Sequence, residues 1–554
     1  MDISEVTKFL KQKKLSPTSI PNSDQLAYSG NLTVGGQIIP IKLVFKSKYP
    51  VDFPDLYIRG WKTSSDLQQQ LGIVNINSDG KLCYIDPSGI WWDSSRTLEF
   101  LQAVLERSEG LLLKKLQDYS DEELFIQDFG AYWNGTRILS RIKLTHYDYY
   151  NVIVSDDIKW IKSSGEQNRS TFFSLRIEHL PIPKNYKNWP PTNLKELIDW
   201  LGKNRSTYKD WISKLADTVK ARTKGKKNDK PLTLGSIFIL DNPISNDLFA
   251  PPVFAATFTI DVRLRHALLG GRTKYISSMS AGIKLNRYVI ERADPDFIYG
   301  RNMPDHKPPL ADKKITVIGA GAIGGFLCSQ LANLGAGSGK RGELLIIDHD
   351  ILKPENIGRH YLGLEYVNKL KADALSVAVS KNHPDLNIAP ICKPFELIIQ
   401  ELKGSSIIIN ATGMQTVGVA LEEILKRTMP VTILHAWIEG QGAGARTLLN
   451  DRQGFACFRC IWNDDDSGNY HSAHPMLQPD TDISLTPAAC HESYYAYPVM
   501  AAVKTATLAA DVIIDYFTET PEPRLRNLVI RKDQCLDPLP DTNPQKSATC
   551  PVCL

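Results

Sequence analysis

Two side-chain cations and an amide follow a glycine-rich turn in this chain, in an order that suits phosphate chemistry. The groups are Gly319, Gly321, Gly324, Asn356, Arg359 and Lys371. Glycines at this spacing let backbone N–H groups approach a phosphate, and the guanidinium and ammonium groups can balance its charge. Two such cations suit a triphosphate better than a pyrophosphate that backbone amides already hold. The pattern therefore predicts a nucleoside triphosphate site.

The elements that position these groups can be read around them. Residues 315–318 predict a short apolar strand that runs into the turn, and a helix-forming stretch of small and apolar residues follows. Residues 344–347 predict a second apolar strand, which ends on Asp348, an acid placed to contact a ribose hydroxyl. The glycine turn alone is also typical of nicotinamide and flavin enzymes, but the later cations do not suit a dinucleotide dehydrogenase.

Four of the nine cysteines form two C-x-x-C pairs, Cys457 with Cys460 and Cys550 with Cys553. Each pair can place two thiolates on a tight turn, and two such turns complete a closed tetrahedral zinc site. A redox dithiol is the alternative for either pair alone. Because all four ligands come from protein, we expect a structural Zn²⁺ that ties the carboxyl-terminal tail to the domain with the glycine turn.

The region from about 301 to 554 resembles the adenylation domain of ubiquitin-activating enzymes and of the ThiF and MoeB adenylyltransferases. The matching residues are the three turn glycines, Asp348, Asn356, Arg359, Lys371 and Glu439-Gly440-Gln441. The resemblance implies a Rossmann-like domain that binds ATP with Mg²⁺. Many bacterial members also carry the two cysteine pairs.

Two positions bear on the subunit state and on the metal. Arg301 matches an arginine that dimeric members of the family extend into the partner's ATP site, so the resemblance implies a homodimer. The family's acidic magnesium residue is replaced here by Gly413. The magnesium ligand stays open between Asp348, Asp350 and a site made mainly of phosphates and water.

Cys490 stands apart from the paired cysteines. It follows an irregular polar stretch, residues 463–479, and precedes a predicted helical run at 494–516. Long loops of this kind are often functional. In activating enzymes the thioester cysteine lies on such a crossover loop, so the resemblance implies that Cys490 is this nucleophile. The alternative is a buried spectator cysteine.

The amino-terminal region resembles a ubiquitin-conjugating domain. That family has a His-Pro-Asn tripeptide whose asparagine lies eight residues before the catalytic cysteine, and here Asn75 lies eight residues before Cys83. Ile73 and Val74 replace the histidine and proline, which raises the question of what holds the loop. The resemblance implies that Cys83 carries a thioester and that the Asn75 amide stabilises the oxyanion of lysine attack. A non-catalytic Cys83 is the alternative.

Length and composition bound the remaining possibilities. With 554 residues, the chain is too long for one core, and we expect a conjugating domain at 1–137, a linker domain at 138–300 and the adenylation domain at 301–554, all of α/β class. A net charge of +4 gives no support for a nucleic-acid partner. No signal peptide or membrane span is visible in the sequence, and we expect a cytoplasmic protein.

Together the resemblances imply an enzyme that activates and conjugates a protein modifier, as in the fusion enzymes of bacterial CBASS anti-phage operons. There the modifier is a cGAS-like nucleotidyltransferase, joined through its carboxyl-terminal glycine to a target lysine. One alternative is the conjugation of a bacterial ubiquitin-like modifier. Another is a sulfur-carrier adenylyltransferase of cofactor biosynthesis with an inert amino-terminal module, which the spacing of Asn75 and Cys83 disfavours.

Overall fold

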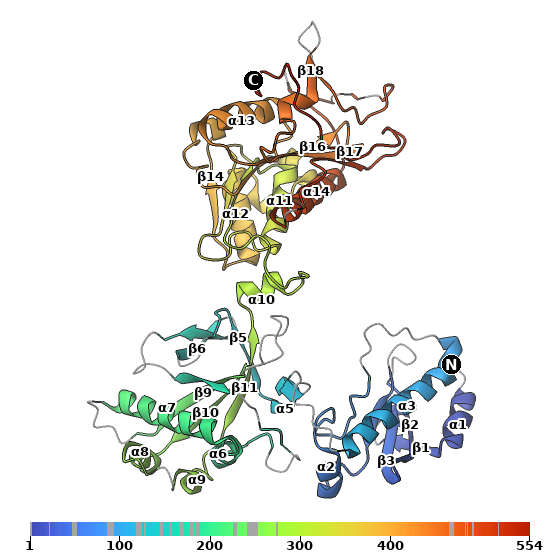
Figure 1. Cartoon of the computed structure of the whole chain (residues 1–554), viewed down its shortest axis with the longest axis vertical. Helices are drawn as coiled ribbons and strands as arrows, with labels where there is room; N and C mark the ends of the chain where they lie inside the picture. Colours follow the sequence, from blue (N-terminus) through green and yellow to red (C-terminus); the bar gives the residue numbers. More distant parts are fainter. Residues whose placement is uncertain are drawn as a thin grey trace. The chain divides into compact units, whose positions relative to one another are not determined.

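The computed structural model consists of two compact units, Met1–Asp294 and Pro295–Leu554. It describes residues 3–553 except 21–22, 47–52, 86–93, 118–124, 127–128, 145–147, 156–157, 165–170, 178–180, 184–188, 225–229, 241–252, 273–274, 465–469, 482, 485, 490–491 and 519. The predicted α/β class, with a Rossmann-like sheet in the carboxyl-terminal unit, is confirmed (Figure 1). Among the described helices, none is both long and apolar enough to cross a membrane.

An antiparallel sheet with the strand order β1-β2-β3-β4 begins the first unit. Alternate residues of β3 face the core, where Ile41 and Leu43 are fully buried against Leu101 and Val104 of helix α3. The bounds are α1 (Ile3–Gln12), β1 (Leu15–Ile20), β2 (Ser23–Val34), β3 (Gln37–Val44), β4 (Asp55–Ile58), α2 (Ser65–Leu71), α3 (Thr97–Leu116) and α5 (Phe129–Trp133).

A closed barrel with the strand order β10-β11-β5-β7-β6-β8-β9 forms the rest of the first unit. Its bounds are β5 (Thr136–Ser140), β6 (Tyr149–Ser155), β7 (Ile158–Ser163), β8 (Phe172–Ile177), α6 (Leu194–Leu201), α7 (Arg205–Thr223), β9 (Leu232–Leu240), β10 (Val253–Ile260), α8 (Val262–Leu269), α9 (Ile276–Met279) and β11 (Asn286–Arg292). Strand β9 is buried along almost its whole length, because its two faces belong to two different hydrophobic clusters. Since β5 starts at Thr136, barrel residues lie on both sides of the boundary expected at residue 137.

A seven-stranded sheet with the order β14-β13-β12-β15-β16-β17-β22 forms the core of the second unit. The first five strands are parallel, and β17 and β22 are antiparallel. The strands are β12 (Lys314–Ile318), β13 (Glu343–Ile347), β14 (Ile388–Ile391), β15 (Ile407–Asn410), β16 (Ile433–Glu439), β17 (Gly444–Asn450) and β22 (Leu525–Val529). Strand β12 lies between β13 and β15, so the strand order reverses at β12. In such folds the ligand binds at this reversal point, beyond the carboxyl ends of the strands.

Helices cover both faces of this sheet. One face packs against α11 (Ala322–Asn333), α12 (Lys371–Asn382) and α14 (Val499–Phe517), and the other against α13 (Gln415–Thr428). Buried residues on both faces explain why β12 and β13 read as continuous apolar runs in the sequence. The unit opens with α10 (Pro295–Gly300).

Two sequence expectations near Cys490 differ from the structure. The helical run expected from residue 494 starts only at Val499, because Pro498 is its N-cap and Glu492–Tyr494 forms strand β21 instead. The stretch at 463–479 contains an antiparallel pair, β18 (Trp462–Asp464) with β19 (Tyr470–Ser472), rather than irregular chain throughout.

Candidate active sites

The glycine turn joins β12 to α11 at the carboxyl edge of the parallel sheet. Gly319 has a φ of +99°, a left-handed conformation that favours glycine. A Cβ atom on Gly324 would overlap the carbonyl oxygen of Gly319. Gly321 is the N-cap of α11 and has open space where a side chain would stand. The glycines thus let the amino terminus of α11 open directly onto the space beyond the sheet edge.

A cavity of about 340 Å³ occupies this space. Its walls include Gly319 and Gly321 of the turn, Asp348 after β13, Lys371 at the start of α12 and Gly413 after β15. The volume is within the range of small-ligand sites. Segments separated by almost one hundred residues therefore converge on one pocket, as expected for a doubly wound sheet.

Asp348 connects the glycine turn to the segment after β13, because each of its carboxylate oxygens accepts one backbone hydrogen bond. Its Oδ2 accepts a hydrogen bond from Ala320 N at 2.7 Å, and its Oδ1 accepts one from Asp350 N at 2.8 Å. Lys371 Nζ donates to Asp350 Oδ2 at 2.8 Å. Burial by itself raises the pKa of Asp350, but this bond and the Lys371 charge outweigh it, so the pKa is lowered. The ionised Asp350 fixes the Lys371 ammonium group at the cavity wall.

Arg359 lies next to the cavity rather than in its wall. Its guanidinium carbon lies 5.6 Å from the ring centroid of Tyr494 and 5.5 Å from that of Tyr497. Burial raises the pKa of the Tyr497 hydroxyl, and the Arg359 charge opposes part of this rise. Because Tyr497 also lines the cavity, two aromatic rings hold this cation at the cavity edge.

Asn356 and Arg301 contact their own neighbours. Asn356 Oδ1 accepts a hydrogen bond from Lys353 N at 3.0 Å, which caps the 3₁₀ segment Pro354–Arg359. The guanidinium carbon of Arg301 lies 5.5 Å from the ring centroid of Phe297, on the surface of the same unit. Neither side chain is part of the cavity wall.

His360 is a site residue that the sequence reasoning missed. Its Nδ1 accepts a hydrogen bond from Leu362 N at 3.1 Å, so the ring proton is on Nε2, which donates to Ala320 O at 2.8 Å. Burial is the main cause that lowers the pKa of His360; the bond to Ala320 O opposes it, the nearby cations Lys371 and Arg359 add to it, and the resulting pKa is about 4. A neutral imidazole therefore links the segment after Arg359 to the glycine turn. Its position directly after the arginine was the available signal.

Asn75 and Cys83 lie together in the first unit. Cys83 N donates to Asn75 O at 2.8 Å, and Ile76 and Leu82 form a β-bridge within the same loop. Asn75 has a φ of +58°, which asparagine tolerates better than most residues. Cys83 is exposed. The spacing of eight residues thus corresponds to a closed loop that brings the asparagine backbone to the cysteine.

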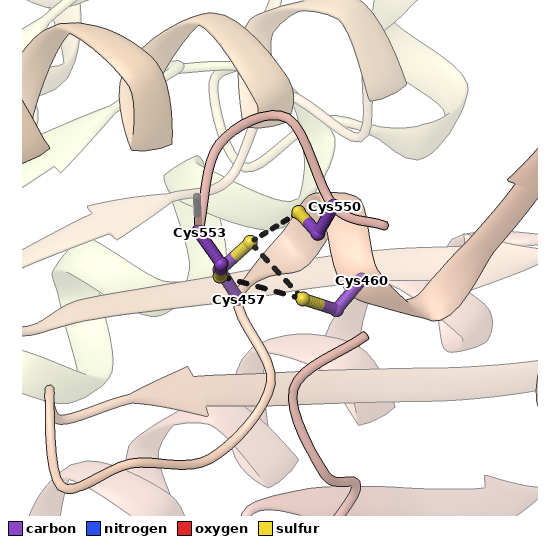
Figure 2. Close-up of side chains that lie close together, drawn as sticks. All are labelled: Cys457, Cys460, Cys550 and Cys553. Carbon is purple, nitrogen blue, oxygen red and sulfur yellow. Dashed lines mark hydrogen bonds between the residues drawn. The ribbon is translucent and has the colours of Figure 1, made fainter. Parts of the chain in front are cut away.

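The four paired cysteines converge on one point of the second unit (Figure 2). The Sγ–Sγ distances are 3.6 Å for Cys457 with Cys460, 3.7 Å for Cys457 with Cys550 and 3.5 Å for Cys460 with Cys553. Thiolates about 2.3 Å from a tetrahedral zinc ion lie about 3.8 Å from one another. The cluster therefore has the donor set and nearly the size of a closed zinc site with four cysteine ligands.

Comparison with known protein families gives one match in each of the two units. The ThiF family model matches residues 303–552, and the model of prokaryotic E2 family B matches residues 8–140. The chain is a fusion of a prokaryotic E2 domain with a ThiF domain. This confirms the predicted union of a conjugating-type and an activating-type enzyme in one polypeptide.

Several known proteins are similar to this chain. The ATP-dependent ubiquitin transferase-like protein Cap2 of Pseudomonas aeruginosa is 27% identical, over 87% of this chain and 86% of that protein. The Cap2 protein of Escherichia coli is 24% identical, over 91% of this chain and 89% of its own length. Human ubiquitin-like modifier-activating enzyme 1 is 34% identical over 85 residues, which are 15% of this chain and 8% of that protein.

Within the ThiF domain, a buried hydrogen-bond chain connects the cysteine cluster to the cavity. Glu422 Oε1 accepts from Phe458 N at 3.3 Å, beside Cys457, and from His435 Nε2 at 3.1 Å. Asn410 Nδ2 donates to His435 Nδ1 at 3.2 Å, and Thr412 Oγ1 donates to Asn410 Oδ1 at 2.7 Å. Thr412 lines the cavity. The cluster thus supports the cavity wall after β15 through buried polar side chains.

The ThiF domain also contains the sequence position of Cys490, which lies outside the described residues. The two strands that flank it, β20 (Thr486–Ala489) and β21, pair antiparallel. Shortly after β21, Tyr497 reaches the cavity wall and the Arg359 guanidinium. The segment that follows the cysteine therefore ends at this cavity.

Proposed function

We propose that this enzyme uses ATP to activate the carboxyl-terminal glycine of a protein modifier, passes it over Cys490 and Cys83, and conjugates it to a target lysine. The observation that carries the proposal is the pairing of two sites in one chain. One is the cavity with Lys371 and the amino terminus of α11, and the other is the closed loop of Asn75 and Cys83. A cofactor-pathway adenylyltransferase has no use for the second site.

In the first step, a carboxylate oxygen of the modifier's terminal glycine attacks the α-phosphate of ATP. An acyl-adenylate forms and pyrophosphate leaves. The backbone N–H groups at the start of α11 and the Lys371 ammonium group stabilise the charge that builds on the phosphate. Arg359 adds a second cation when its side chain turns from the tyrosine rings to the phosphates, and Asn356 sets the start of its segment.

Among the acids that line the cavity, Asp348 and Asp350 would hold Mg²⁺, which when bound shares the phosphate charge. Potential ligand atoms of Asp348, His349 and Asp350 all lie within 4.8 Å of one another. Asp350 already faces Lys371, and Asp348 already accepts two backbone N–H groups. Their remaining lone pairs fit a water-rich magnesium site rather than a closed protein cage. The cysteine cluster fits Zn²⁺, whose role there is structural.

In the later steps, the Cys490 thiolate attacks the acyl-adenylate carbonyl, which forms a thioester and releases AMP. The Cys83 thiolate then takes the acyl group and frees the Cys490 thiolate. Finally, the neutral amine of a lysine attacks the thioester at Cys83, an amide bond forms, the Cys83 thiolate leaves and the amine proton passes to water. The Asn75 side chain donates a hydrogen bond to the oxyanion of this last step.

The similarity to Cap2 proteins over most of the chain supports a place in CBASS anti-phage defence, in the cytoplasm, with a cGAS-like nucleotidyltransferase as the modifier. A homodimer in which Arg301 reaches the partner's ATP site completes the proposal. If the genes beside this one encode a ubiquitin-like protein instead, conjugation of that modifier replaces this reading while the chemistry stays the same.

Modifier-dependent exchange of pyrophosphate into ATP tests the activating step. Lys371→Ala should lower the exchange rate at least about 100-fold, because the reaction loses a cation where phosphate charge develops. Lys381→Ala, an exposed lysine near the end of the same helix α12, is the matched control and should exchange at the wild-type rate. Wild-type exchange by Lys371→Ala, or exchange that does not need the modifier, would contradict the proposal.

A further inference from the structure

We infer that Tyr132 is a positioning residue for lysine transfer, because its hydroxyl and the apolar residues before Asn75 hold the loop that His and Pro hold in other conjugating domains. The inference rests on the proposed role of Asn75 as the oxyanion donor. It concerns how the backbone of Asn75 is held in its positive-φ conformation, which no sequence motif of this chain explains. Tyr132 lies 57 positions away in the sequence.

The first observation is a direct hydrogen bond. Asn75 N donates to the Tyr132 hydroxyl oxygen at 2.9 Å, and Tyr132 is only 4% exposed. On its other side, the Asn75 carbonyl accepts from Cys83 N at 2.8 Å. Both backbone groups of Asn75 are therefore held, one by the cysteine segment and one by helix α5. A residue with positive φ needs such restraint, because its conformation is sparsely populated in free chain.

The second observation is the packing of the two substituted positions. Ile73 is fully buried and Val74 is 4% exposed, and both belong to the hydrophobic cluster that contains Phe125, Phe129 and Tyr132. The same cluster extends into the barrel strands and helices. Polar histidine would be out of place in this environment, since its ring nitrogens would need partners there. The aliphatic residues thus fit a loop that is anchored by burial.

The third observation links the two restraints. The rings of Phe125 and Tyr132 stack with their centroids 5.1 Å apart, and Phe125 also contacts Phe129 and Trp189. The cluster that buries Ile73 and Val74 therefore also fixes the ring whose hydroxyl holds Asn75 N. A loss of the hydroxyl alone should move only the asparagine, because ring packing would remain.

The experiment uses the full chain and needs no natural modifier. A glycine-ended peptide thioester of mercaptoethanesulfonate charges exposed Cys83 by thiol exchange, without ATP, and releases the small thiol. Discharge to free lysine is then followed by mass spectrometry, with peptide mapping to select the Cys83 adduct. Tyr132→Phe keeps the ring and removes the hydrogen-bond acceptor. Tyr28→Phe is the matched control, because buried Tyr28 shares a hydroxyl hydrogen bond with Thr7 at 2.7 Å, away from the Asn75 loop.

We expect Tyr132→Phe to charge Cys83 normally and to discharge about 3- to 10-fold more slowly, the cost of one neutral hydrogen bond. Tyr28→Phe should discharge at the wild-type rate. Asn75→Asp should discharge about 10²–10³-fold more slowly, because it lacks the amide donor. In the Asn75→Asp background, Tyr132→Phe should cause no further slowing, since it acts through the asparagine. Hydrogen exchange at the Asn75 backbone amide should be faster in Tyr132→Phe than in wild type.

The outcomes separate the inference from the function on which it rests. If Asn75→Asp discharges slowly while Tyr132→Phe matches Tyr28→Phe, the positioning role is wrong and the proposed function stands. If Tyr132→Phe slows both charging and discharge, or slows Asn75→Asp further, its role is general folding and the inference is overturned. If Asn75→Asp discharges at the wild-type rate, the role of Asn75 in the proposed function fails, and the role of Tyr132 fails with it.

Discussion

The glycine turn of the ThiF domain and the Asn75 loop of the E2 domain are both held in defined backbone conformations, but different forces hold them. The turn is fixed by polar side chains, chiefly Asp348 after strand β13 and His360 after the 3₁₀ segment Pro354–Arg359. The Asn75 loop is fixed by buried apolar residues and by one distant tyrosine hydroxyl. Polar contacts leave the turn open to a charged ligand, whereas burial leaves the loop rigid without a ligand. The two sites should therefore respond to different perturbations.

Gly324→Ala should cause the largest difference in effect between the two sites. The added methyl group overlaps the Gly319 carbonyl oxygen, so the turn must move away from its phosphate-binding shape. We expect pyrophosphate exchange to be abolished while a chemically charged Cys83 still discharges to lysine at the wild-type rate. Gly358→Ala, where a Cβ atom meets open space, is the control. Equal loss of both reactions would show that the two sites are not held independently.

The next largest effect should follow loss of the zinc that we propose for the cysteine cluster. Cys550→Ser removes a thiolate from a four-thiolate site, whose binding energy is also folding energy. Elemental analysis should find one zinc per wild-type chain and none in the variant, with a lower midpoint of thermal unfolding. Because the Glu422 chain leads from the cluster to Thr412, the variant should also show a raised KM for ATP. Cys392→Ser, outside the cluster, should change none of these three quantities: the zinc content, the midpoint of thermal unfolding and the KM for ATP. Wild-type protein without zinc would overturn the assignment.

Ile73→Ala tests burial as the anchor of the Asn75 loop. Ile73 is fully buried, and truncation of such a residue typically destabilises by about 2–5 kcal/mol. Chemical denaturation should show the loss, and lysine discharge from Cys83 should slow while pyrophosphate exchange is retained. Ile38→Ala, at a position 67% exposed, should leave both stability and discharge nearly unchanged. If Ile73→Ala discharges normally, burial does not position the loop.

The smallest effect should be a pH dependence at the glycine turn. The pKa of His360 is lowered from 6.5 to about 4, so the unfolded chain binds the proton more readily than the folded one. Its contribution to stability is complete above the unfolded pKa of 6.5 and is lost as the pH falls to about 4, a loss of roughly 3 kcal/mol. His360→Gln should flatten this part of the stability profile. The exposed His266→Gln should not, and an unchanged profile in His360→Gln would contradict the assignment.

The contrast between the sites also explains what the sequence could predict. Strands 315–318 and 344–347 and the order of glycines, acid and cations were readable, because the glycine turn and Asp348 directly follow the ends of these two strands. Parallel strands bring their carboxyl ends together, so linear order is enough to predict convergence. His360 was missed because a single histidine has many uses, and its neutral state depends on burial that the sequence does not show.

The conjugating loop was predicted only in part, for the opposite reason. The spacing of Asn75 and Cys83 is local, so the pair could be found. What holds the pair is not local, because Tyr132 is far along the chain and Ile73 and Val74 look like ordinary apolar residues. The barrel topology could not be predicted either, since several of its strands pair out of sequence order, such as β5 with β11 and β6 with β8.

The order of thioester transfer tests the central claim most directly. The measurement is the thiol-labile adduct of the modifier on each cysteine after incubation with ATP, resolved by mass spectrometry. We predict that Cys83→Ala forms the adduct at Cys490 and that Cys490→Ala forms none at Cys83. An adduct at Cys83 in the Cys490→Ala variant would contradict the account.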